Sequence, residues 1–176
     1  MIKNYDDFLY YLEEDKKMLN ITRKRPRLIG DEVWLFQIYL RKVEYYLNCG
    51  NTVVDQILLK IYKFRKYKMM LKLGFSIPNN VFGPGLSISH AGTIVVNSKA
   101  KIGANCRIHN CVVIGSAPII GDNCYIGPGV KIFGKINIPD NVKIGANCVV
   151  NKSIKNPDST VVGIPFKELI KNTSKE

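Results

Sequence analysis

The sequence predicts a mainly β protein, in which a parallel β-helix of hexapeptide repeats follows a short α-helical segment. The first observation is an isoleucine at every sixth position from Ile102 to Ile144 without a miss, and Val96 and Val150 continue the spacing. We call this series the isoleucine ladder. The second observation is a small or apolar residue four positions after each ladder residue: Ala100, Cys106, Val112, Pro118, Cys124, Val130, Ile136, Val142, Cys148 and Ile154. A period of six fits neither an α-helix nor an alternating strand, and it is typical of a hexapeptide β-helix.

The repeat length indicates how the coils are built. Each hexapeptide supplies one short strand and one corner, and three hexapeptides close a triangular coil. Ladder side chains then point inward and stack about 4.8 Å apart on successive coils. Residues eighteen apart in the sequence should therefore lie above one another, and we expect residues 74–167 to form this domain.

The first 73 residues are expected to be helical. Apolar spacing predicts helices over residues 4–19, from an N-cap at Asp31 to Gly50, and over residues 52–73 with Gly74 as the C-terminal stop. The third helix interleaves lysines with an apolar stripe. The favoured interpretation packs this stripe on the β-helix below a solvated basic face. The alternative is a surface for anionic lipid or a polyanion.

Composition narrows the class of protein. The 26 basic and 14 acidic residues give a net charge of +12, which suits acidic ligands. The basic residues occur throughout the chain, which argues against a dedicated nucleic-acid arm. The sequence has no stretch able to cross a membrane and no signal-peptide core at its start, so we expect a cytoplasmic protein. We expect residues 168–176 to form a C-terminal tail.

The cysteines are predicted to be structural. Cys106, Cys124 and Cys148 all occupy the inward small-residue position, and no CxxC pair occurs. A free cysteine behaves as a small apolar residue when buried. We therefore expect buried, reduced thiols without disulfides or a metal, and a more accessible thiol at Cys111.

The two histidines are the residues that suggest chemistry. His109 follows Ile108, in a position that usually holds a small residue, so it should face outward near a corner. His90 lies eighteen residues before Ile108, so the two imidazoles should lie on consecutive coils and nearly stack. His90 nominally falls on an inward position, but the glycines around it indicate irregular first coils.

Several segments together resemble one family. They are Gly83-Pro84-Gly85, His90-Ala91-Gly92-Thr93-Ile94-Val95-Val96, residues 144–150 and Val162-Gly163-Ile164-Pro165. Over about residues 75–167 the chain is similar to the serine acetyltransferase family of hexapeptide acyltransferases. The resemblance implies a left-handed β-helix, a homotrimer, and acetyl-CoA bound between subunits.

The resemblance also implies roles for individual residues. His90 matches the catalytic histidine, which takes a proton from the acceptor hydroxyl, and such a base is worth roughly 10²–10⁴-fold. The alternative for His90 is a hydrogen-bonded histidine at an irregular coil. The acceptor side is expected to comprise His109, Ser89 and Asn110, although His109 fits a surface corner equally well. The residues expected at acetyl-CoA are Ala146, Gly163, Ser116, Ala117 and Lys167.

Departures from the family point to another acceptor than serine. The aspartate that orients the catalytic histidine would fall near Phe75, and Ser116-Ala117 stand where the family has an Arg-His pair. An amino-acid substrate needs a carboxylate for its ammonium and a cation for its carboxylate. We therefore expect acetylation of a sugar hydroxyl in surface polysaccharide biosynthesis, with L-serine as the alternative acceptor. Weak membrane association is expected if the sugar is lipid-linked.

Two other functions known for such prisms fit less well. A γ-type carbonic anhydrase needs three histidines at its zinc, whereas the whole chain has two. A non-catalytic ice-binding prism needs outward rows of threonine, which the repeats lack.

Overall fold

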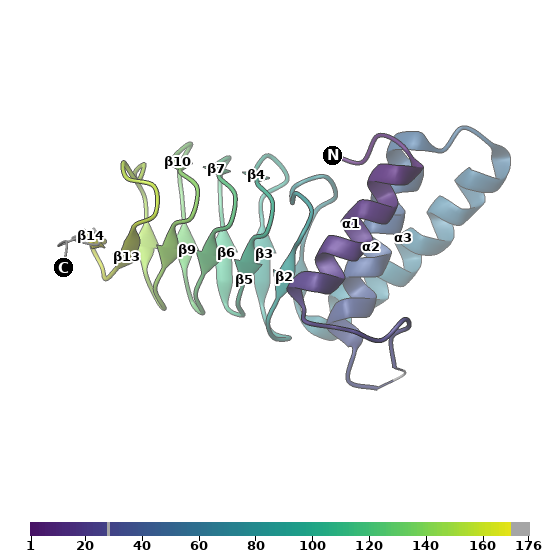
Figure 1. Cartoon of the computed structure of the whole chain (residues 1–176), viewed down its shortest axis with the longest axis horizontal. Helices are drawn as coiled ribbons and strands as arrows, with labels where there is room; N and C mark the ends of the chain where they lie inside the picture. The colour runs from purple at the N-terminus through teal and green to yellow at the C-terminus, as the bar shows by residue number, and fades with distance from the viewer. Residues whose placement is uncertain (28, 170–176) are drawn as a thin grey trace.

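The computed structural model describes residues 1–27 and 29–169. Three helices lie together at one end of the molecule, and the rest of the chain winds away from them as a β-helix (Figure 1). The β-helix has about five coils of parallel strands and is left-handed, as predicted. No helix in these described ranges is both long and apolar enough to cross a bilayer.

The three expected helices are present, with the predicted caps. They are α1 (Tyr5–Met18), α2 (Glu32–Cys49) and α3 (Val53–Leu73). Thr52 and Asp55 form a reciprocal capping box at the start of α3, and Gly74 ends it in the left-handed conformation. Asp31 is the N-cap residue of α2, but its carboxylate binds the Arg23 guanidinium instead of a helix N–H.

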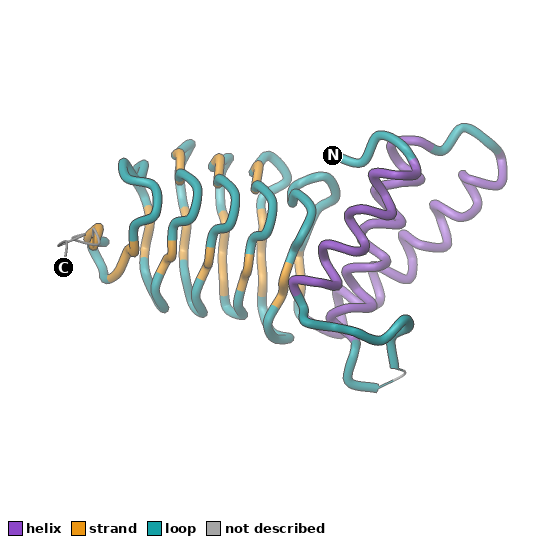
Figure 2. Tube along the Cα trace, viewed as in Figure 1, coloured by secondary structure: helices purple, strands orange, loops and turns teal. Residues whose placement is uncertain are grey.

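Short strands recur in three rows along the β-helix, with loops at the corners (Figure 2). The first sheet has the order β1-β3-β6-β9-β12, the second β10-β7-β4, and the third β14-β13-β11-β8-β5-β2. All pairs are parallel except β13 with β14. The strands are β1 (Phe75–Ser76), β2 (Ser87–Ile88), β3 (Ile94–Val96), β4 (Lys101–Ile102), β5 (Arg107–Ile108), β6 (Val112–Ile114), β7 (Ile119–Ile120), β8 (Tyr125–Ile126), β9 (Lys131–Ile132), β10 (Asn137–Ile138), β11 (Lys143–Ile144), β12 (Val149–Val150), β13 (Thr160–Val162) and β14 (Lys167–Leu169).

The isoleucine ladder forms the core of the prism. None of its ten residues is more than 4% exposed, and the small or apolar residues four positions later are buried as well. Cys106, Cys124 and Cys148 are therefore buried free thiols, and Cys111 is exposed, as predicted. Burial raises the pKa of the Cys124 thiol to about 11, which keeps it protonated and inert at neutral pH.

The first coil departs from the predicted spacing. Most stacked residues are eighteen apart, as in the pairing of Ile94 with Val112. Ile88, however, pairs with Ile108, twenty residues later, because two additional residues lie in the corner between β2 and β3. The expectation that His90 lies one regular coil before Ile108 is thus wrong in register. Ile88 takes the inward position, and His90 lies on the enlarged corner.

The helices are joined to the first coil through a buried charged cluster. The Arg41 guanidinium donates to Asp15 over 2.8 and 3.1 Å and to Glu44 over 2.9 Å. It also donates to the backbone carbonyl oxygens of Phe82 and Gly83. All three charged side chains are almost fully buried. One arginine therefore ties α1 and α2 to the start of the β-helix.

The third helix packs differently from the favoured interpretation. Its buried residues are Leu59, Lys66 and Leu73, which lie on the side facing the rest of the molecule. The apolar stripe that was expected to cover the β-helix is instead exposed, with Phe64 59% and Leu71 67% accessible. The residue spacing correctly predicts an apolar stripe on α3, but the prediction that this stripe packs on the β-helix is wrong.

In the structure, α3 ends at Leu73 and β1 begins at Phe75. Residues 168 and 169 belong to β14 and not to the tail to which we assigned them. The remaining expected tail, residues 170–176, lies outside the described part of the chain.

Candidate active site along one edge of the prism

The candidate site follows the edge between the third and the first sheet. We call this the His90 edge, and define it by the corner residues 89–93, 109–111, 127–130, 145–148 and Gly163. Each segment joins a strand of the third sheet to the next strand of the first sheet, except that Gly163 simply follows β13. Side chains on these corners therefore line up along the length of the prism.

The two histidines lie together at the start of this edge. The His90 side chain is exposed and His109 is half-buried, and their ring centroids are 5.9 Å apart. The Ser89 hydroxyl lies 3.3 Å from Nε2 of His109, within hydrogen-bonding distance. The structure thus brings His90, His109 and Ser89 into one cluster, despite the changed register.

The enlarged corner packs against the next coil and is hydrogen-bonded to the end of α3. Gly92 has φ +129, and a Cβ there would lie 3.1 Å from Cβ of Asn110, so Asn110 fits directly against a glycine. The Gly92 N–H donates to the Leu73 carbonyl oxygen at 2.9 Å. The end of α3 therefore fixes the corner that carries His90, and Asn110 belongs to the same cluster.

His109 is surrounded by groups that disfavour its charged form. Burial lowers the pKa of His109, and the nearby Arg107 and His90 lower it further. The Tyr125 ring packs edge-on against the imidazole with centroids 5.1 Å apart. His109 is therefore neutral at pH 7, able to accept or donate one hydrogen bond at each ring nitrogen.

Arg107 and Tyr125 were missed by the sequence analysis. Both stand directly before a ladder isoleucine, in the outward strand position of the third sheet, and Arg107 pairs with Tyr125 across the coils. A search of the positions before Ile108 and Ile126 for aromatic or charged residues would have found them.

The residues expected at acetyl-CoA divide between two edges. Ala146 and Gly163 lie further along the His90 edge, and Lys167 is paired with Val162 on β13, next to Gly163. Ser116 and Ala117 lie in the corner between β6 and β7, where the first sheet meets the second. A single chain therefore does not bring Ser116 and Ala117 to His90.

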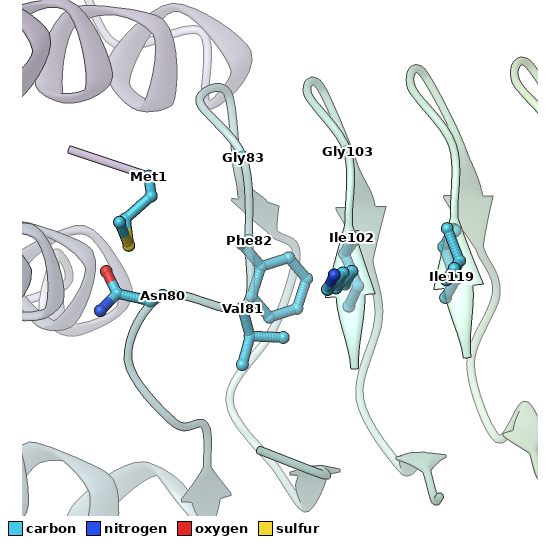
Figure 3. Close-up of a pocket in the computed structure, with 10 residues that line it drawn as sticks. Met1, Asn80, Val81, Phe82, Gly83, Ile102, Gly103 and Ile119 are labelled. Carbon is cyan, nitrogen blue, oxygen red and sulfur yellow. The ribbon is translucent and has the colours of Figure 1, made fainter. Parts of the chain in front are cut away.

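Two hollows differ in their relation to this edge. One, of about 320 Å³, is mostly apolar and is lined by Tyr125, Lys143, Ile144, Gly145 and Thr160 on the third sheet. It adjoins both the ring that packs on His109 and the small residues Gly145 and Ala146. The other lies between the N-terminus and the second sheet, lined by residues that include Asn80, Phe82, Ile102 and Ile119 (Figure 3). That second hollow contains neither histidine.

Within residues 1–27 and 29–169, no three side chains of the types that bind metals come together.

The solved structures that resemble this fold include serine acetyltransferases. No protein-family model matches the chain, and no curated protein sequence matches it. The enzyme of Neisseria gonorrhoeae is 24% identical, with a TM-score of 0.71, and the match covers 98% of this chain and 70% of that one. Soybean serine acetyltransferase complexed with serine is 22% identical, with a TM-score of 0.71 and coverage of 93% and 70%. A serine acetyltransferase in complex with CoA is 20% identical, with a TM-score of 0.71 and coverage of 94% and 71%. The chain therefore has the fold of the serine acetyltransferases, as its sequence resemblance predicts.

Proposed function

We propose that the chain is a cytoplasmic, trimeric O-acetyltransferase that transfers the acetyl group of acetyl-CoA to a hydroxyl, with a sugar of a surface polysaccharide as acceptor. The observation that carries this proposal is the exposed His90 imidazole, on a corner enlarged by two residues and clustered with His109 and Ser89. The corner that carries His90 interrupts the regular coil and is held by backbone hydrogen bonds, while the histidine side chain itself is exposed. Such a side chain is available for chemistry and does not serve packing. The shared fold supports the same reaction class.

His90 acts as the general base in this proposal. Its neutral imidazole takes the proton of the acceptor hydroxyl while the oxygen attacks the thioester carbonyl carbon. The tetrahedral intermediate then collapses, the C–S bond breaks, and the imidazolium returns its proton to the CoA sulfur. His109, neutral and half-buried beside His90, orients the acceptor together with Ser89 and Asn110.

Acetyl-CoA lies along the His90 edge in this proposal. Gly145 and Ala146 leave room for the thin pantetheine arm beside the apolar hollow at Tyr125, and Lys167 supplies a cation near Gly163 for the phosphates. Ser116 and Ala117 come from the neighbouring subunit, because they lie on another edge of the prism. The similar structure that holds CoA supports this choice of donor.

A neutral acceptor suits the charges around the histidines. Among the described residues, the ionisable groups that lower the pKa of His109 are Arg107 and His90, and no carboxylate acts on it. A sugar hydroxyl needs no partner for an ammonium group, whereas an amino acid does. L-Serine is the second candidate, supported by the similarity to serine acetyltransferase structures, which include the soybean enzyme complexed with serine.

The test is release of free CoA thiol from acetyl-CoA in the presence of L-serine, free sugars, nucleotide sugars or polysaccharide fragments. We expect turnover with a saccharide and not with L-serine. His90→Ala should reduce the rate by roughly 10²–10⁴-fold. Because His90 is exposed, the circular dichroism spectrum and the melting temperature should stay unchanged.

Lys101→Gln, on the second sheet away from the histidines, is the matched control and should keep full activity. Near-normal activity of His90→Ala would refute the assigned base. Fast acetylation of L-serine would replace the saccharide acceptor and leave the reaction class intact.

A further inference from the structure

The outward side of α3 is an apolar stripe without a partner in the described chain. Its exposed members follow one another at spacings of three or four residues, which places them on one side of the helix. They are Val54, Ile57, Ile61, Phe64, Tyr67 and Leu71. Scattered exposed apolar residues are normal, but a continuous patch marks an interaction surface. We call these six residues the α3 stripe.

Basic residues flank the α3 stripe on both sides. At 100° per residue, Lys63 lies on one flank and Arg65 on the other, Lys72 lies at the border marked by Val54, and Lys60 falls within the arc of the stripe. Lys68 lies within the stripe, with its ammonium 4.7 Å from the centre of the Phe64 ring. The sole acidic residue of α3, Asp55, is engaged in the capping box at the opposite end from Lys68 and Lys72.

The charge decides which partner fits. A second α3 packed against the first would bring these cations face to face, at a repulsive cost. A helix with an apolar face and lysines along its borders is instead the pattern of helices that lie in the plane of a membrane interface. Anionic headgroups attract flanking lysines while the apolar side chains reach the acyl boundary.

We propose that the α3 stripe docks this protein on the surface of an anionic lipid bilayer. The helix lies flat, with its packed side, Leu59 and Lys66, towards the protein, and with Ile57 and Phe64 in the lipid. Lys66 is held away from the membrane, because its ammonium donates to Asn79 Oδ1 at 2.6 Å.

The docked helix is coupled to the His90 corner. The Leu73 and Gly74 carbonyl oxygens at the end of α3 accept the N–H groups of Gly92 and Ile94 over 2.9 and 3.1 Å. These two hydrogen bonds thus join the end of α3 to the corner that carries the candidate base. Docking itself requires no acetyl transfer, so it is tested without an activity measurement.

The experiment is flotation of the full-length protein with vesicles. Vesicles of phosphatidylcholine are compared with vesicles that contain phosphatidylglycerol as well, at low and high salt. We expect binding only to the anionic vesicles, weakened by high salt. Each neutralised lysine should lower the affinity about fivefold at low salt, so Lys60→Gln with Lys63→Gln should lower it by more than tenfold. Ile57→Ser with Phe64→Ser should abolish flotation.

Matched controls lie elsewhere on the surface. Lys99→Gln with Lys101→Gln removes two exposed charges from the β-helix, and Leu9→Ser removes an exposed leucine from α1, and both should float as the wild type does. In a Phe64→Trp variant, emission should shift to the blue with anionic vesicles only, whereas a Leu9→Trp variant should show no shift.

Three flotation outcomes would overturn the proposal, and so would one change in the state of assembly. The flotation outcomes are absence of flotation with anionic vesicles, equal flotation with neutral ones, and flotation unaffected by the changes in the α3 stripe. If the Ile57→Ser and Phe64→Ser double variant instead dissociates a larger assembly, the stripe is covered by a second copy and the membrane proposal fails.

Discussion

At the scale of single residues, the site depends on two extra residues in one corner. A strict six-residue spacing predicts that the His90 side chain points inward. In the structure Ile88 pairs with Ile108 and takes the inward position, so His90 lies on the outward-facing corner. Sequence alone locates the irregularity, because glycines surround His90, but it cannot tell in which turn the extra residues are accommodated. That choice depends on hydrogen bonds such as the one from Gly92 to Leu73, which joins residues from different regions.

The pKa of His109 should rise when Arg107 loses its charge. Burial is the largest cause of its low pKa and Arg107 is the next, so Arg107→Gln should raise the pKa of His109 while leaving it below 6.5. NMR titration of the imidazole C–H signals measures this shift, and Lys101→Gln should leave the signals unchanged. An unaltered pKa in Arg107→Gln would show that Arg107 does not contribute to the shift.

The lowered pKa of His109 also affects stability. The folded chain binds the His109 proton more weakly than the unfolded chain does. The resulting loss of unfolding free energy is absent above pH 6.5 and grows as the pH falls through the folded-state pKa of His109. Acid therefore destabilises the wild type at this residue, and the effect should be smaller in Arg107→Gln.

At the scale of elements, the strands could be predicted and the helix contacts could not. A buried strand position repeats every six residues and needs no knowledge of a partner, which is why all ten ladder residues are buried as predicted. An amphipathic pattern shows only that a helix has an apolar side. What covers that side depends on the surrounding surfaces, and in α3 the covered side includes a lysine, Lys66, that the pattern does not reveal.

Arg41 should be the most sensitive charged residue of the junction between helices and prism. Burial alone would lower its pKa, but Asp15 and Glu44 outweigh burial and raise it, so the guanidinium stays charged. Arg41→Met leaves two buried carboxylates uncompensated and should cost about 3–5 kcal/mol of unfolding free energy, measured by urea denaturation.

The comparison is Arg23→Met, which breaks the partly exposed pair with Asp31. That change should cost about 0–1 kcal/mol. If the two variants lose equal stability, the buried cluster is not what holds the helices to the first coil.

At the scale of the whole molecule, the residues expected at acetyl-CoA and at the catalytic position lie on two different edges of the prism. This division predicts an active site that two subunits share. His90 lies on one edge and Ala117 on another, so a closed ring of three subunits would present the Ala117 edge of one subunit to the His90 edge of the next. We expect a trimer by light scattering.

Mixing inactive subunits tests this arrangement. His90→Ala and Ala117→Trp subunits should each be inactive alone. After mixed refolding, about a quarter of the sites would join two intact edges, so about a quarter of the wild-type activity should return. A mixture of wild-type and His90→Ala subunits gives the reference for refolding yield. No recovery from the two inactive variants would mean that each site lies within one subunit.

The reversed direction of β14 also limits the growth of the molecule. The outermost strand of a stack of coils exposes unpaired N–H and C=O groups along its edge. A strand of another chain can pair with these groups, and repeated pairing leads to polymers. In the third sheet, β14 runs antiparallel on β13 and occupies those groups with a strand that cannot continue the winding. At the other end the three helices cover the first coil. In the third sheet, the end of the solenoid is thereby protected against the addition of a further strand by its own last described strand.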